Sequence, residues 1–263
     1  MLFRINLQEN EAAVDAVVDV ISHLPKMSGS SASTAAPSSY GVLPPYSLDA
    51  KTASEIYPLS GWLAKPVLSS LEHQAISRLI SGETEEDIAE EEQDEEDEET
   101  EAKTPVVHPR VVLECIKLVQ GVGDSKLKKQ RARILTFLEL VIRLQKTRPK
   151  QVRDTIEELE VSEAVKNALK DRFLEAEGRR LSHTTQCQHR LLCLLCIILL
   201  TVCNFNVSKV VRDALAKDLR VTGSKLNTYF KEVGCNFSRE NSACVLTVPF
   251  KLPRLRQGRG GGS

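Results

Sequence analysis

The sequence predicts a mainly α protein in which two helical modules, each closed by a small β wing, follow a largely disordered linker. Three observations lead to this prediction. Apolar residues recur at helical spacing through most of the chain after residue 105. Aromatic residues make up only 5% of the 263 residues, which disfavours an all-β fold. A short alternating run, 243–252, indicates a strand at the end of the second module.

The part of the chain before residue 83 is expected to contain linkers rather than a domain. Residues 1–53 include a stretch rich in Ser, Ala and Pro, whose apolar content is too low to offset the entropy of ordering. We assign 1–53 as a flexible segment. Residues 54–82 regain large apolar side chains, among them Tyr57, Trp62 and Leu68. We interpret 54–82 as a linker that docks on a partner through these three side chains.

Charge is distributed very unevenly along the chain, although the formal net charge is only −1. The 19 residues from Glu83 to Glu101 carry 14 acidic side chains and no basic one, whereas 103–263 carry 30 basic and 15 acidic side chains. Because like charges at this density repel, 83–104 is predicted to be a disordered acidic tract. Two interpretations of the tract are open: a solubilising spacer, or a gate that competes with nucleic acid for the basic modules.

Helices and a rudimentary wing are predicted in residues 105–182. Breaks at Gly121, Gly123, Pro149 and Glu160 divide four stretches with helical apolar spacing. These stretches are 106–120, 126–146, 149–159 and 161–174. A stunted wing is expected around Phe173 to Ala176, which makes this module a weaker copy of the one that follows.

Residues 183–253 carry the clearer pattern. A long apolar helix covers about 185–202, and Asn206 is expected to cap a second helix that ends at Leu219. Thr222 is expected to cap a third helix, 224–233, and Gly234 follows as the residue that ends it. Three helices with a tight turn between the second and third, followed by a β-hairpin, indicate a winged helix. The fold prediction is therefore a tandem winged-helix protein with modules at 105–182 and 183–253.

The third helix of a winged helix abuts the DNA groove, so its solvent-facing residues are the first candidates for nucleic-acid contact. An ordinary solvated helix face is the alternative interpretation of the same residues. Further basic residues lie in the wing, in the first module and in the basic, Gly-rich tail 254–263, where they would neutralise phosphates without reading sequence. For the tail, a disordered terminus with incidental charge is the alternative interpretation. The nucleic-acid-binding candidates are Ser224, Lys225, Thr228, Lys231, Arg239, Lys128, Lys129, Arg131, Arg254 and Arg256.

Signals for catalysis, metal binding and membrane insertion are weak. Cys193 and Cys196 form a CxxC pair inside a continuous apolar helix, which favours buried core thiols over a metal site, and no phosphate-cradling glycine loop is present. The seven cysteines and the lack of an N-terminal apolar leader indicate a reduced, intracellular protein. The apolar run Leu191 to Cys203 has 13 residues, against roughly 20 for a bilayer span. We expect no enzyme activity, no metal, no cofactor and no membrane.

Two stretches resemble a known family. The run NVSKVVRDALAKDLRVTGSKLNTYFKEVGCNF, followed by VLTVPFKLPRLR, is similar to the end of the RNA polymerase I-specific subunit of the A-forty-nine type, the polymerase-I-associated factor family. The residues that carry the likeness most specifically are Gly234, Cys235, Pro249, Phe250, Lys251, Leu252 and Pro253. The segment EIYPLSGWLAKPVLSSL also resembles the linker that precedes the family's winged helices.

The resemblance implies a non-catalytic subunit of RNA polymerase I in the nucleolus of the nucleus, acting like TFIIE in initiation and elongation of ribosomal RNA synthesis. It implies polymerase I core subunits and double-stranded DNA as partners. A polymerase I initiation factor and a TFIIF-like subunit are further candidates. The family's N-terminal half is a dimerising β-barrel, for which residues 1–53 are too few and too polar. A sequence-specific transcription regulator and a protein-docking adaptor are the alternative functions.

Overall fold

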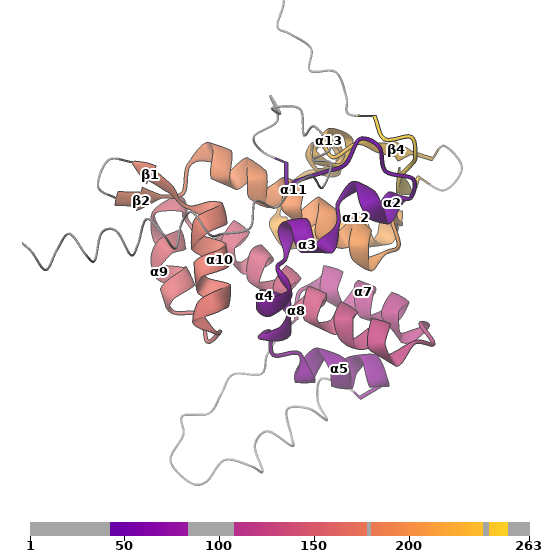
Figure 1. Ribbon diagram of the computed structural model, residues 1–263, viewed down its shortest axis with the longest axis horizontal. Helices are drawn as coiled ribbons and strands as arrows, with labels where there is room; N and C mark the ends of the chain where they lie inside the picture. The colour runs from indigo at the N-terminus through magenta and orange to yellow at the C-terminus, as the bar shows by residue number, and fades with distance from the viewer. Residues whose placement is uncertain (1–42, 84–107, 178–179, 239–241, 252–263) are drawn as a thin grey trace, which may run out of the picture. The chain divides into compact units, whose positions relative to one another are not determined.

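Helices make up most of the regular structure, and two small antiparallel sheets complete it (Figure 1). The computed structural model describes residues 43–83, 108–177, 180–238 and 242–251. The predicted fold class, mainly α with a small β wing, is confirmed. The tail 254–263, most of the flexible segment 1–53 and of the acidic tract 83–104, and the candidates Arg239, Arg254 and Arg256 lie outside the described residues.

The first module contains the predicted helices. They are α7 (Arg110–Gln120), α8 (Ser125–Lys146), the short 3-10 turn η1 (Pro149–Gln151), α9 (Val152–Glu157) and α10 (Glu163–Phe173). Asp124 caps the start of α8, because its side chain accepts a hydrogen bond from the backbone N–H of Lys126. A short hairpin follows, in which β1 (Glu175–Glu177) pairs with β2 (Arg180–Ser182). A stunted wing is therefore present where the sequence predicts one.

The second module has the order helix, strand, helix, helix, strand, strand. Its elements are α11 (Thr185–Val202), β3 (Asn206–Val207), α12 (Lys209–Leu219), α13 (Gly223–Glu232), β4 (Cys235–Phe237) and β5 (Cys244–Leu246). The three strands form an antiparallel sheet in the order β3-β5-β4. This is the element order of the winged helix predicted for 183–253.

Local details of the second module confirm two predicted boundaries and correct two others. Thr222 caps α13 by accepting a hydrogen bond from Lys225 N–H, and Gly234 follows the helix with a positive φ of 88°. Asn206 does not cap α12; it lies in β3, and Ser208 is the N-cap instead. The strand predicted for 243–252 is shorter, because only Cys244–Leu246 pair with β4.

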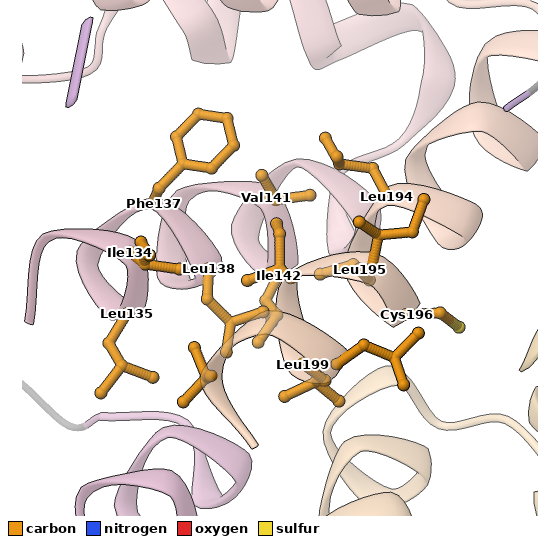
Figure 2. Packing of buried hydrophobic residues seen from close by; sticks show 14 of the residues in the cluster. Ile134, Leu135, Phe137, Leu138, Val141, Ile142, Leu194, Leu195, Cys196 and Leu199 are labelled. Carbon is orange, nitrogen blue, oxygen red and sulfur yellow. The ribbon is translucent and has the colours of Figure 1, made fainter. Parts of the chain in front are cut away.

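The two modules share one hydrophobic core. Helix α8 packs against α11 and α7 packs against α12, so each contact joins a helix of the first module to one of the second. Figure 2 shows the α8–α11 contact, in which Leu138 and Ile142 lie beside Leu195 and Leu199. Helix α11 is long and apolar enough to pass a length-and-composition test for a membrane span. Since 67% of it is buried within this chain, it is a core helix, as predicted.

The segment 54–82 is folded onto both modules. It forms the short helices α2 (Ala53–Ile56), α3 (Leu59–Trp62), α4 (Lys65–Ser69) and α5 (Gln74–Ser81), which appear in indigo and violet in Figure 1. Helix α5 packs on α7 and α8, and α4 packs on α8 and α10. Residues 54–82 are therefore part of the chain's own core.

The prediction that 54–82 docks on a partner through Tyr57 and Trp62 is corrected by their burial. Only 2% of Tyr57 and 1% of Trp62 are exposed, so neither side chain has surface left for a partner. The rings of Tyr57 and Phe250 meet edge to face, and Trp62 lies beside Phe137. An aromatic ring buries so much apolar area that packing into the nearest core is strongly favoured. Leu68 is partly buried against the same core.

Candidate nucleic-acid interface

A groove of about 400 Å³ lies between α12, α13 and the β4–β5 wing. The groove has three basic lining residues, Lys209, Arg212 and Lys231, and one acidic lining residue, Asp213. Lys209 and Lys231 are exposed, whereas Arg212 is buried. The groove therefore combines a fixed internal cation with two lysines that are free to move toward a ligand.

Arg212 forms the floor of this groove. Its guanidinium donates through Nη1 to Asn227 Oδ1 at 2.5 Å and through Nη2 to the carbonyl of Ser242, and it lies 4.9 Å from the centre of the Phe237 ring. These contacts fasten α12 to both α13 and the wing. Phe237 also lies near Lys231, whose Nζ is 5.9 Å from the ring centre.

The charge of Arg212 is not neutralised within the part of the chain that the structure describes. Only 6% of its surface is exposed, no carboxylate of the described residues forms an ion pair with it, and its Nε has no hydrogen-bond partner there. Buried cations are usually paired, because removing a charge from water is costly. An unpaired guanidinium raises the positive potential of the groove and favours an anion at its mouth.

The candidates predicted on the third helix lie on the solvent-facing side of α13. Ser224, Lys225, Thr228 and Lys231 are exposed, while Leu226 and Phe230 on the opposite side are buried. The hydroxyl of Thr228 donates to the carbonyl of Ser224 at 3.2 Å. The four side chains therefore share one accessible face that adjoins the groove through Lys231.

The basic candidates of the first module do not form one surface. Lys129 is exposed and Lys128 is half-buried, but only 5% of Arg131 is exposed. Its Nη2 donates to Asn204 Oδ1 in the turn after α11, and burial lowers the pKa of the guanidinium. Arg131 is thus a buried link between the modules, and its prediction as a phosphate contact is corrected.

Lys209, Arg212 and Asn227 were not among the sequence candidates, although they line the groove. Arg212 directly follows the buried Val211 and precedes the buried Ala214 and Leu215. An arginine among the apolar residues of a helix indicates that its guanidinium is buried and hydrogen-bonded within the protein. The sequence around Arg212 carries this signal. The position of Asn227 opposite Arg212 depends on how α12 and α13 cross.

Comparison with known families gives a match over almost the entire chain. The model of the A49-like RNA polymerase I associated factor family matches residues 4–253. The chain belongs to this family. A comparison with curated proteins returns no match.

Membership of the polymerase-I-associated factor family connects this chain with RNA polymerase I. Proteins of this family associate with RNA polymerase I and take part in transcription in the nucleus. The match begins well before the segments on which the sequence resemblance rests, so it also includes residues of the N-terminal segment. An associated factor of a polymerase works as an accessory to the enzyme, in line with the expectation that this chain is not itself catalytic.

Proposed function

We propose that this polymerase-I-associated factor is a non-catalytic subunit of RNA polymerase I that binds double-stranded DNA nonspecifically through its winged helices. In this role it supports initiation and elongation of ribosomal RNA synthesis in the nucleolus. The observation that carries the proposal is the groove between α12, α13 and the wing, where Arg212 is buried without a carboxylate partner among the described residues and Lys209 and Lys231 are exposed.

The groove fits a phosphate better than a base edge. Lysine side chains neutralise phosphates as flexible point charges and carry little sequence information. Bidentate readout of a base would need an accessible guanidinium or amide. Arg212 donates hydrogen bonds through its two Nη atoms to Asn227 and Ser242. Neither this guanidinium nor the Asn227 amide is therefore available for bidentate contact with a base. A subunit that stays on a polymerase across every sequence needs this kind of contact.

The exposed face of α13 extends the cationic surface beside the groove. Lys225 and Thr228 lie on that face, and Lys231 belongs to both the face and the groove. In the helix-turn-helix geometry the third helix approaches the groove of the duplex and the neighbouring elements contact its backbone. The groove would therefore hold a backbone phosphate while α13 lies along the duplex.

Binding of the full chain to several unrelated duplexes tests the DNA-binding part of the proposal. The double variant Lys209→Ala, Lys231→Ala should bind all of them more weakly and by a similar factor. A matched control, Lys117→Ala with Lys217→Ala, removes the same charge from a different groove, between α7 and α12. Loss of binding to one sequence alone would instead favour a sequence-specific regulator. Equal affinities of both double variants and the wild type would contradict the assignment of the groove.

Purification of the tagged chain from cells tests the subunit assignment separately. Polymerase I core subunits should co-purify with the wild type. They should also co-purify with the Lys209→Ala, Lys231→Ala variant, because the groove is proposed to contact DNA rather than the polymerase. Loss of the polymerase with this variant would favour the protein-docking adaptor, and absence of polymerase I from the wild-type preparation would contradict the subunit assignment.

A further inference from the structure

Three side chains with metal-binding atoms meet where α11 and α13 cross. His189 and Cys193 lie one turn apart on α11, and Glu232 is the last residue of α13. One ligand atom from each residue lies within 4.8 Å of the others. The cluster lies outside the proposed DNA groove, and its residues are not among the lining residues of that groove.

The cluster is closed on one side and accessible on the other. Cys193 is fully buried in α11, whereas the side chains of His189 and Glu232 are 38% and 30% exposed. The His189 ring meets the Tyr229 ring edge to face, with their centres 5.2 Å apart, and this contact holds the imidazole over α13. A buried sulfur with two partly exposed partners leaves an open direction toward solvent.

The nitrogen and sulfur ligand atoms are grouped around one carboxylate oxygen of Glu232. His189 Nε2 is hydrogen-bonded to Glu232 Oε2, and Cys193 Sγ lies 3.9 Å from the same oxygen. Zinc binds imidazole nitrogen and carboxylate oxygen at about 2.0–2.2 Å and thiolate sulfur at about 2.3 Å, so ligand atoms around one ion lie roughly 3–4 Å apart. Small side-chain rotations would open the His189–Glu232 pair enough to admit an ion.

We propose that His189, Cys193 and Glu232 form a binding site for a divalent transition-metal ion of the zinc class, with a water molecule at the fourth position. The donor set supports this class. Nitrogen, sulfur and carboxylate oxygen together suit Zn²⁺, whereas Mg²⁺ and Ca²⁺ prefer oxygen ligands alone. Two ligands spaced i and i+4 on one helix lie on the same face, and the third comes from the helix that packs on it.

Metal binding at this position would add a cross-link between α13 and the core helix α11. At present the end of α13 is held to α11 by the His189–Glu232 hydrogen bond and by buried apolar residues. On binding, the Cys193 thiol releases its proton to solvent and the imidazole carries its remaining proton on Nδ1. A thiol must lose its proton to become a metal ligand, and a bound divalent cation stabilises the resulting thiolate.

Titration of the metal-free full chain with Co²⁺ tests the site directly, because cobalt reports its ligands by absorption. We expect a thiolate-to-cobalt charge-transfer band together with the visible bands of a four-coordinate ion, at a stoichiometry of one ion per chain. Cys193→Ser should abolish the charge-transfer band. His189→Ala should weaken cobalt binding at least roughly tenfold, because even the loss of an outer-shell partner of a ligand typically costs about 10- to 100-fold in metal affinity. The partly exposed position of His189 makes this a mild change for folding.

Two further cysteine variants serve as controls, because other thiols also lie close together. Cys235 neighbours Cys244, and Cys115 neighbours Cys203. Cys235→Ser and Cys115→Ser should keep the full cobalt spectrum. No charge-transfer band in the wild type, or a band that survives Cys193→Ser and disappears in either control, would overturn the proposal. Addition of Zn²⁺ should raise the melting temperature of the wild type but not that of His189→Ala.

Discussion

The phenolic hydroxyl of Tyr57 donates a hydrogen bond to the backbone carbonyl of Val233, at 3.2 Å, across 176 positions of the sequence. Val233 is the C-cap residue that directly follows α13, so the contact attaches the segment 54–82 to the end of the proposed DNA-binding helix. The ring of Tyr57 also meets the rings of Tyr46 and Phe250 edge to face. The part of this segment around Tyr57 is therefore packed against the second module.

Tyr57→Phe should destabilise the chain by about 1 kcal/mol, because the change leaves the buried carbonyl of Val233 without its donor while the ring packing is kept. Urea unfolding followed by circular dichroism measures the change. Tyr46→Phe, at the neighbouring partly buried ring, is the matched control and should have a smaller effect. Equal stabilities of Tyr57→Phe and the wild type would show that the hydrogen bond contributes nothing.

Gly234→Ala should destabilise the chain by about 2 kcal/mol, because it combines backbone strain with overpacking. Gly234 has φ of 88°, which L side chains rarely adopt, and an added Cβ would lie 2.3 Å from Cε2 of Phe250. Gly123→Ala is the control, because a Cβ there meets nothing within 4 Å. Thermal unfolding of both variants gives the comparison, and a neutral Gly234→Ala would mean that the Phe250 ring moves aside without cost.

Asp218→Ala should cost about 1 kcal/mol, in the range measured for removal of N-terminal helix caps. The Asp218 carboxylate, on α12, accepts a hydrogen bond from the backbone N–H of Val111 at 2.8 Å, in the first turn of α7. A residue of the second module thus caps a helix of the first. Asp213→Ala, at an exposed position of the same helix, should change the free energy of unfolding by less than about 0.5 kcal/mol.

The salt dependence of DNA binding should change when the groove lysines are removed. Removing one lysine–phosphate interaction reduces the slope of log K against log salt by about 1, so Lys209→Ala with Lys231→Ala should reduce it by about 2. Fluorescence anisotropy with one duplex over a series of salt concentrations measures the slope. The Lys117→Ala, Lys217→Ala control should retain the wild-type slope. A similar reduction in the control would show that DNA binding depends on the overall positive potential of the chain and not on lysine–phosphate contacts in the groove.

The cysteine thiols of the metal-free native chain should react slowly with an alkylating reagent at neutral pH. All seven are buried, and burial is the main reason that the pKa values of Cys193 and Cys196 are raised. The thiolate is the reactive form, so the native rates should be more than roughly tenfold below those of the denatured chain. Mass spectrometry counts the modified thiols over time, with the denatured chain as control. Rapid labelling of Cys193 before unfolding would contradict the burial.

The sequence predicted local structure well where one helix could be judged by itself. Helices at 185–202 and 126–146 follow from apolar spacing, and Thr222 follows from its position before a helix. The exposed face of α13 was predicted from the same spacing. Whether that face binds DNA remains a prediction, since an exposed lysine has the same spacing on any solvated helix.

The errors and omissions have a common cause. The sequence assigns Tyr57 and Trp62 to a partner because they stand in a segment too short to be a domain, and Arg131 to phosphate because it belongs to a run of basic residues. The structure buries all three, since residues far away in the sequence provide their neighbours: Val233 for Tyr57, Phe137 for Trp62 and Asn204 for Arg131.

By itself, the sequence determined the positions of the helices, the helical identity of the apolar stretch at 185–202 and the separation of acidic from basic charge, because periodicity, capping and charge are properties of neighbouring residues. Only the tertiary structure decided that the buried Arg212 shares a groove with two exposed lysines and that Glu232 meets His189 and Cys193. These arrangements depend on how α11, α12 and α13 cross, and the crossing is set by the packing of the whole core.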